Sequence, residues 1–176
     1  MTYEFKIEEY DPEWKEWFTQ LRKYFEYYLS NLIIRIEHVG STAIPNMVAK
    51  PIIDMDIVIK KENFNEIKTK LEEMGYSHQG DLGVEEREAF KLLNDELKQS
   101  LLPHHLYVCN QDSKELKRHI IFREFLRNNP KEANEFCRIK RELYKRFSNN
   151  KEAYIEAKDS TVKEILRKAL KQHANV

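Results

Sequence analysis

The amino-acid sequence predicts an α/β (α+β) fold, in which a mixed β-sheet with flanking helices is followed by a helical C-terminal half. Two apolar, β-branched runs over residues 33–39 and 51–59 are typical of strands, and helical periodicity precedes and follows them. A further strand is expected over 104–109. From residue 113 onward, apolar residues recur at helical spacing. We therefore expect one domain over residues 1–176, with a sheet-containing core to about 112 and helices over about 113–173.

The N-terminal region predicts a short strand followed by a long helix. Residues 3–9 alternate, with Tyr3, Phe5 and Ile7 on one face. Asp11 is the expected N-cap of the helix, and Pro12 its first helical residue. An aromatic stripe at helical spacing follows, which favours a core-facing helix over a base-stacking surface: Trp14, Trp17, Phe18, Leu21, Tyr24, Phe25 and Tyr28.

The remaining elements are predicted from helical periodicity and from the Gly, Pro and Asn residues that interrupt it. A helix is expected from Glu62 to about Met74, ended by Gly75, and the next region holds a loop marked by glycines and a candidate strand over 88–93. Asn-Asn-Pro at 128–130 and Ser-Asn-Asn at 148–150 separate the C-terminal helices. Those helices are predicted over 113–127, 131–148 and 151–173.

Composition is typical of a soluble globular protein, with 41% hydrophobic and 34% charged residues. No run approaches the roughly 18 apolar residues of a membrane span, and the N-terminus does not resemble a secretion signal. Cys109 and Cys137 show no metal or redox spacing, so reduced thiols and a cytoplasmic location are expected. No residue pattern determines an oligomeric state.

The net charge of zero conceals an asymmetry between the two halves. Residues 1–112 carry 13 Lys and Arg against 21 Asp and Glu, a balance of −8, and residues 113–176 carry 17 against 9, a balance of +8. A basic wall facing an acidic cleft would attract a polyphosphate. The basic residues are nevertheless interleaved with acids at helical spacing, which is typical of solvated helix faces, so dedicated nucleic-acid binding is not expected.

Asp54 and Asp56 are the most informative residues of the chain. Side chains two apart in a strand point to the same face, so the two carboxylates lie together, while Ile53, Met55 and Ile57 share the opposite face. Adjacent carboxylates on an apolar strand repel each other and cost desolvation energy. A bound Mg²⁺ or Mn²⁺ would neutralise the pair and hold substrate phosphates.

A turn of small residues before this strand supports a phosphate site. Gly40 lets the backbone approach a ligand closely, and Ser41 and Thr42 offer hydroxyl donors to phosphate oxygens. Lys50 could place a positive charge beside the same oxygens. The alternative is an ordinary tight turn with two solvent-facing aspartates on an edge strand, although the strand is unusually apolar for such an edge.

These residues resemble a known pattern. Gly40-Ser41 followed by Asp54-x-Asp56 is similar to the signature of the DNA polymerase beta-like nucleotidyltransferase superfamily. Longer segments resemble the bacterial GrpB family across nearly the whole chain: YDPEW from Tyr10, IEHVGSTAIPNMVAKPIIDMDIVI from Ile36, HHLYVC from His104, FREFLRNNP from Phe122 and YIEAK from Tyr154.

The resemblance implies a metal-dependent nucleotidyltransferase with a nucleotidyltransferase-like sheet. Asp54 and Asp56 would be catalytic and would bind Mg²⁺ or Mn²⁺. The substrates would be a nucleoside triphosphate and a small-molecule acceptor. The phosphates would be held by Gly40, Ser41 and Thr42, and neutralised by Lys50 and Arg87.

Superfamily enzymes usually add a third carboxylate from a neighbouring strand, and the matching strand here, 104–109, contains no acid. Either His105 serves as a ligand, Glu37 contributes from the preceding strand, or the protein is a non-catalytic nucleotide-binding or sensing module. Phosphoester hydrolysis using His105 with the aspartates is a further alternative. His104 faces away from His105, and the spacing of His38, His104 and Cys109 does not favour a structural zinc site.

Basic residues elsewhere have two interpretations. Arg87, placed in a loop, could bind a phosphate with its guanidinium, or form a surface ion pair with Glu85 or Glu88. Four more basic residues fall in the family-like words of the helical half and could reach a phosphate, although such side chains are mostly solvated: Arg118, Arg123, Lys140 and Lys158.

Overall fold

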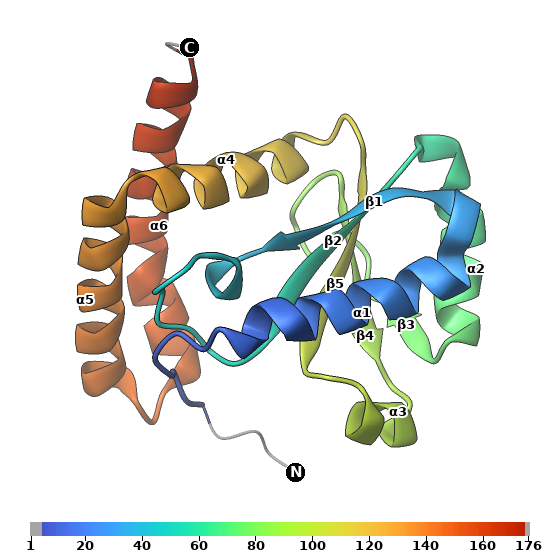
Figure 1. Ribbon diagram of the computed structural model, residues 1–176, viewed down its shortest axis with the longest axis horizontal. Coiled ribbons are helices and arrows are strands. Elements are labelled where there is room, and N and C mark those ends of the chain that lie inside the picture. Colours follow the sequence, from blue (N-terminus) through green and yellow to red (C-terminus); the bar gives the residue numbers. More distant parts are fainter. Residues whose placement is uncertain (1–4, 175–176) are drawn as a thin grey trace.

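The computed structural model, which describes residues 5–174, is a five-stranded mixed sheet with helices on both faces (Figure 1). The strands lie in the order β1-β2-β5-β4-β3. Their bounds are β1 Ile33–Val39, β2 Ile53–Ile59, β3 Tyr76–His78, β4 Arg87–Leu92 and β5 His104–Asn110. The helices are α1 Glu13–Leu29, α2 Phe64–Glu73, α3 Asp95–Ser100, α4 Lys114–Asn128, α5 Pro130–Phe147 and α6 Lys151–Ala174. The predicted α/β architecture with a helical C-terminal half is confirmed.

The register of the central strands determines which side chains meet on the sheet. β2 pairs antiparallel with β1 and parallel with β5. Asp56 lies opposite Glu37 on one side and Tyr107 on the other. Asp54 lies opposite Val39 and His105. Because paired residues point to the same face, these polar side chains gather on one side of the sheet.

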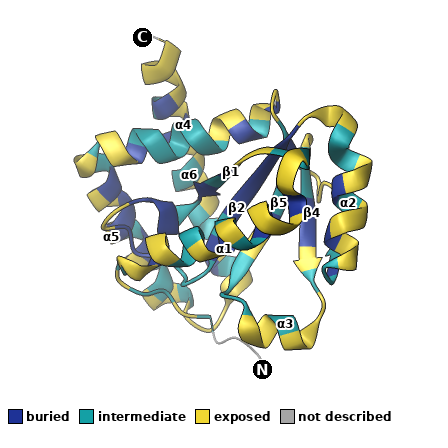
Figure 2. Cartoon of the chain, turned by 45° about the vertical axis from the view of Figure 1, so that its right-hand side comes forward, coloured by how far each residue is buried: buried dark blue, intermediate teal, exposed yellow. Residues whose placement is uncertain are grey.

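α1 and α2 cover the opposite, apolar face of the sheet and form the main core with it (Figures 1 and 2). Trp14, Leu21 and Phe25 are buried on α1, as the aromatic stripe predicted. The stripe leaves the core at its C-terminal end, where Tyr28 is 49% exposed. β2 is buried along almost all of its length, so its two aspartates belong to an internal strand and not to a solvent-facing edge.

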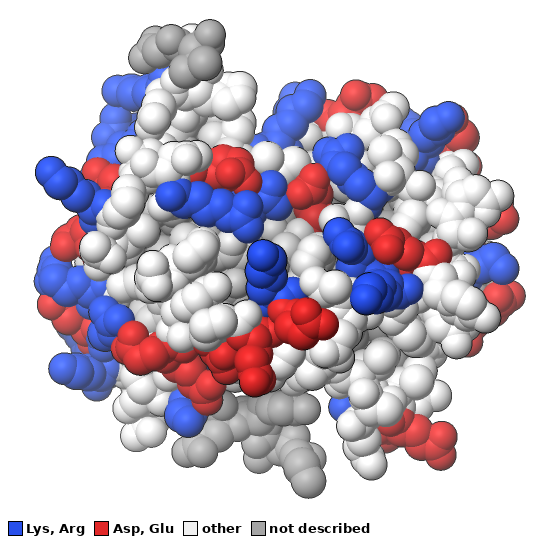
Figure 3. Space-filling model, viewed as in Figure 1, with Lys and Arg blue, Asp and Glu red and all other residues white. Residues whose placement is uncertain are grey.

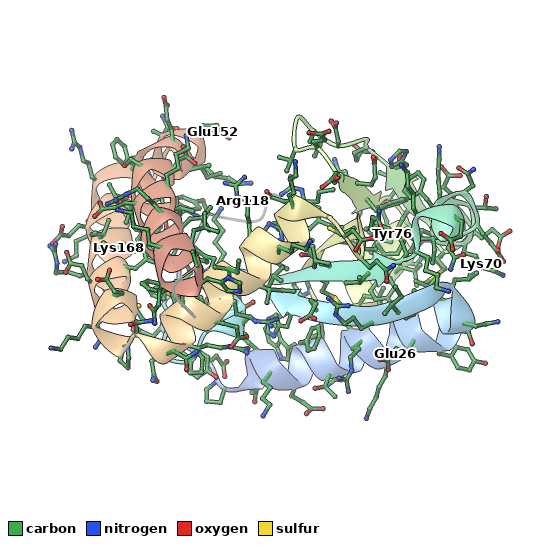
Figure 4. The ribbon with its side chains drawn as sticks, turned by 90° about the horizontal axis from the view of Figure 1, so that it is seen from above. Glu26, Lys70, Tyr76, Arg118, Glu152 and Lys168 are labelled. Atoms are coloured by element: carbon green, nitrogen blue, oxygen red, sulfur yellow. The ribbon has the colours of Figure 1, made fainter. Side chains whose placement is uncertain are left out.

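The C-terminal helices lie against the polar face of the sheet and beside it (Figure 4). α4 crosses that face near one end, where Leu116 packs with Val58 and Cys109. α5 and α6 pack against each other and against α4. Ile44, Met47 and Val48, from the loop before β2, join them in a second core. This packing brings α5 to the turn that precedes β2, where Lys140 and its partner Ser41 are 99 positions apart in sequence.

Three local predictions were wrong or incomplete. Of the strand expected over 3–9, Tyr3 and Glu4 lie outside the described residues, and the rest forms only a single bridge, between Glu8 and Ala49. The short elements β3 and α3 were not predicted, because three and six residues are too few to show a periodicity. α3 begins at a side-chain cap, since Asn94 Oδ1 accepts a hydrogen bond from Leu97 N at 3.0 Å.

Two features concern the molecule as a whole. Within residues 5–174, no helix is long and apolar enough to span a membrane. On the face seen in Figure 3, acidic side chains gather in a band below the centre, and basic side chains are scattered around it. This surface differs from the concentrated basic stripe that is typical of nucleic-acid-binding proteins.

Candidate functional site

Asp54 and Asp56 project from β2 onto the polar face of the sheet. Asp56 is fully buried, and the Asp54 side chain is 31% exposed. The Oδ1 atom of Asp56 is buried and has no hydrogen-bond partner in the described part of the chain. A buried carboxylate oxygen without a donor is costly, and a bound cation would relieve that cost.

His119 on α4 forms a hydrogen bond with the other carboxylate oxygen of Asp56. Its Nδ1 donates to Asp56 Oδ2 at 2.7 Å, and its Nε2 lies 3.3 Å from Glu115 Oε1. Burial alone would lower the pKa of His119, but the bonds to Asp56 and Glu115 raise it to about 9. The imidazolium therefore neutralises Asp56 from within the protein. Sequence reasoning missed His119, and its position three residues after the inward-facing Leu116 was the available signal.

Gly40 brings the turn before β2 into contact with Asp54. Its φ is +71°, and a Cβ atom there would lie 2.2 Å from Asp54 Oδ2. Only glycine accommodates both the backbone conformation and this approach. The predicted turn and the predicted aspartate are thus in direct contact.

Ser41 follows in a short 3₁₀ turn and is held by a lysine from α5. Lys140 Nζ donates to Ser41 Oγ at 2.8 Å and also to the carbonyl oxygen of Val48. Lys140 is 2% exposed, and this burial, together with the nearby Lys158, lowers the pKa of Lys140 to about 7. The prediction that such helical lysines are mostly solvated was wrong for Lys140.

Two further lysines lie near this turn. Burial and the charges of Lys151 and Lys158 lower the pKa of Lys50 to about 8. Burial also lowers the pKa of Lys158, and the charge of Asp54 opposes that effect. Lys50, Lys140 and Lys158 thus form a partly desolvated cationic cluster next to Asp54, which an anionic ligand would relieve.

The Thr42 hydroxyl forms hydrogen bonds with other groups of the protein. Its Oγ1 lies 2.9 Å from His38 Nε2 and 3.5 Å from the carbonyl oxygen of Ile52. His38 in turn stacks on Phe18 of α1 at 4.6 Å between ring centroids. Burial lowers the pKa of His38 to about 4, so its ring is neutral at physiological pH. Thr42 therefore faces the core side and not the aspartates.

His105 and His104 point to opposite faces of β5, as predicted. His105 Nδ1 donates to Asp54 Oδ1 at 2.8 Å, and its side chain is 54% exposed. His104 Nε2 lies 2.6 Å from the Tyr76 hydroxyl on the other face, and its Nδ1 donates to the Leu102 carbonyl oxygen at 2.7 Å. His105 joins the aspartates, whereas His104 is structural.

The two remaining candidates, Arg87 and Glu37, do not join the aspartates as free ligands. Arg87 is in β4 and not in a loop; its guanidinium lies 4.4 Å from the Tyr107 ring centroid, two strands away from β2. The structure therefore does not bring Arg87 beside the Gly40 turn. Glu37 is paired with Arg123 at 2.9 Å and with Arg35 at 2.8 Å, which makes it a poor substitute for a third free carboxylate.

The two aspartates could bind a hard cation whose other ligands come from a bound substrate. Asp56 Oδ1 is unpartnered, and Asp54 Oδ2 lies at the glycine turn. Mg²⁺ commonly uses one or two carboxylates and takes its other ligands from phosphates and water. Across residues 5–174, no group of three or more His, Cys, Asp or Glu side chains is arranged to hold a metal by itself. Asp54 and Asp56 could therefore supply carboxylate oxygens to such a cation.

Comparisons with known proteins agree on one family. The family model described as GrpB protein matches residues 4–168. The chain is 32% identical to the protein YqkA of Bacillus subtilis over 155 residues, which cover 88% of this chain and 44% of that protein. It is 30% identical to the glutamate-rich protein GrpB of Alkalihalophilus pseudofirmus over 161 residues, covering 89% of this chain and 91% of that protein.

Solved structures extend the comparison to the fold. The crystal structure of the conserved protein GrpB from Enterococcus faecalis superposes with a TM-score of 0.82 at 29% identity, over 96% of this chain and 99% of that one. Cid1, solved in complex with its short product ApU, superposes with a TM-score of 0.55 at 9% identity, over 85% of this chain and 48% of Cid1. The second likeness concerns the fold alone. On these matches the chain belongs to the GrpB family and has a nucleotidyltransferase-like fold.

Proposed function

We propose that the protein is a metal-dependent nucleotidyltransferase that transfers a nucleotidyl group from a nucleoside triphosphate to a small-molecule acceptor. The observation that carries the proposal is the contact of the Gly40–Ser41 turn with Asp54, beside the buried Asp56. Two carboxylates thus lie beside the Ser41 hydroxyl, which accepts a hydrogen bond from Lys140. Together these groups could bind a triphosphate and its cation.

Each residue has a role in this reaction. Asp54 and Asp56 would hold Mg²⁺ or Mn²⁺, which supplies charge neutralisation for the triphosphate when bound. Ser41 would donate to a phosphate oxygen, and Lys140, Lys50 and Lys158 would balance the phosphate charge. An acceptor hydroxyl oxygen bonds to the α-phosphorus, the bond to pyrophosphate breaks, and the hydroxyl proton is lost to solvent.

A labelling experiment tests the proposal. The protein is incubated with a nucleoside triphosphate labelled at the α-phosphate, Mg²⁺ and a pool of small cellular metabolites, and labelled products are separated by chromatography. We expect a labelled product and an equal amount of pyrophosphate, both lost in Asp54→Asn. Asp112→Asn, at an exposed position in the turn after β5, is the matched control. Product formation that persists in Asp54→Asn contradicts the proposal.

A second candidate is a non-catalytic nucleotide-binding or sensing module. It is favoured by the lack of an acid at the β5 positions opposite Asp54 and Asp56, which hold His105 and Tyr107. It is also favoured by the imidazolium of His119, which already balances Asp56. This candidate predicts metal-dependent nucleotide binding without labelled product, so the same experiment combined with a binding measurement separates the two.

A further inference from the structure

A groove of about 690 Å³ opens beside the His105–Asp54 pair, where β2 and β5 begin. One wall is the segment Lys50–Ile52, which leads into β2. The opposite wall includes Leu101 and Leu102, which lead into β5, and Leu82 from the loop before β4. His105 and Tyr107 form the part of the wall nearest to the aspartates. The groove is therefore continuous with the candidate site, and Lys50 borders both.

The groove walls are largely apolar. Pro51, Ile52, Leu102 and Pro103 contribute aliphatic surface, and Leu82 is 65% exposed at the edge. Apolar side chains that remain accessible around a cavity of this size are typical of sites that bind the body of an organic ligand. A triphosphate group alone would gain little binding free energy from these apolar walls.

The charged residues that line the groove are mainly lysines. Glu8 is the one acidic residue among its described lining residues, and Lys6 lies 3.1 Å from it. Lys98 is paired with Asp95 at 2.8 Å. The other three lining lysines form no ion pair within residues 5–174: Lys50, Lys91 and Lys151. The groove thus combines an apolar interior with an excess of positive charge.

We infer that this groove holds the acceptor, and that the acceptor is an organic anion with an apolar or aromatic body and a carboxylate or phosphate group. Its apolar body would contact Leu102 and Ile52, while its anionic group would meet Lys91. Its reacting hydroxyl would lie at the His105 end, next to Asp54. This inference rests on the proposed function for the identity of the occupant, but the binding preference of the groove can be measured independently.

The experiment uses two fluorescent probes of similar aromatic body and different charge. The anion 8-anilinonaphthalene-1-sulfonate and the neutral N-phenyl-1-naphthylamine are titrated into the full-length protein. The variants are Lys91→Glu, at the exposed edge of the groove, and Lys60→Glu, an exposed lysine at the opposite end of β2. Both substitutions change the net charge equally, so that only the position of the charge differs.

We expect Lys91→Glu to weaken binding of the anionic probe about 3- to 10-fold, as charge reversal at a separation of several ångströms implies. Lys60→Glu should change it less than about 2-fold. Binding of the neutral probe should be unchanged in both variants. Equal effects of the two substitutions, or equal binding of the two probes to the wild type, overturn the inference.

Two further arms separate the groove from the nucleotide site. Anionic-probe binding should persist in Asp54→Asn, so a failure of nucleotide binding leaves the groove result intact. ATP with Mg²⁺ should bind together with the probe. Competitive displacement of the probe by ATP would assign the groove to the nucleotide base and overturn its assignment to the acceptor.

Discussion

The Nδ1 atom of His119 lies 2.7 Å from the Oδ2 atom of the fully buried Asp56. The two residues come from α4 and β2, so the ion pair also fixes the helix across the sheet. The pKa of His119 is raised to about 9, and its ring is therefore charged at physiological pH. An internal cation at this place lets Asp56 remain buried in the absence of a metal, since an unpaired buried charge is strongly destabilising.

The first prediction concerns the pH dependence of stability. Because the pKa of His119 is about 9 in the folded protein, above its ordinary value of 6.5, protonation stabilises the fold. This contribution is fully present below about pH 6.5 and is lost as the pH rises through about 9. We expect the loss of unfolding free energy in His119→Gln to be larger by about 2–3 kcal/mol at pH 6 than at pH 10.

Urea unfolding of the wild type and His119→Gln at both pH values measures this difference. His173→Gln, at an exposed position of α6, is the control and should show the same small effect at both values. Equal destabilisation by His119→Gln at low and high pH contradicts a charged His119–Asp56 pair.

The second prediction concerns the glycine turn. Gly40→Ala combines a positive φ of 71° with a steric clash on Asp54 Oδ2. Gly83→Ala is the matched control, because its φ is 79° and nothing lies within 4 Å of the added Cβ. We expect Gly83→Ala to cost about 1 kcal/mol of stability and Gly40→Ala about 2–4 kcal/mol, measured by chemical unfolding. Similar costs for the two variants would show that the contact with Asp54 can relax freely.

The third prediction concerns Lys140. Lys140→Met keeps the length and the apolar stem of the side chain but removes the amine that bonds Ser41. We expect a folded protein whose affinity for nucleoside triphosphate is about 10- to 100-fold weaker, the effect of losing one charge-assisted hydrogen bond. Calorimetric titration measures it, with Lys145→Met on the exposed side of α5 as the control. An unchanged affinity removes Lys140 from the phosphate site.

The fourth prediction concerns proton uptake. With a pKa of about 7, Lys140 is mostly neutral at about pH 8. A phosphate beside it would favour the ammonium form, so nucleotide binding should take up a proton from the buffer. Calorimetry in two buffers of different ionisation enthalpy measures the uptake, which should decrease in Lys140→Met. Identical binding heats in the two buffers contradict this role for the lysine cluster.

Strand residues of the site could be predicted from the sequence because their geometry has a fixed period. Alternation along β2 placed Asp54 and Asp56 on one face, and alternation along β5 separated His105 from His104, and the structure has this arrangement. The glycine turn was also recognisable, since glycine is required where the backbone approaches Asp54. These relationships are local or depend on neighbouring strands.

Helical residues of the site could not be placed in the same way. Helical periodicity indicates which face of a helix is buried but not which partner it meets, and Lys140 is 99 residues away from Ser41 in sequence. Its position on α5, in phase with Phe136 and Cys137, was a usable signal, because a lysine on an apolar stripe needs a partner. Arg87 was predicted in a loop and lies in β4, because the start of β4 carries no alternating pattern.

A nucleotide site at Asp54 and Asp56 is tested most directly by a thermal-shift titration of ATP, GTP, CTP and UTP, each with and without Mg²⁺, on the wild type and on Asp54→Asn. A ligand at 100 times its dissociation constant should add about 2.7 kcal/mol of stability. We expect stabilisation by at least one nucleotide that requires Mg²⁺ and is lost in Asp54→Asn. Stabilisation that is equal in the two proteins, or that no nucleotide produces, contradicts a nucleotide site at Asp54 and Asp56.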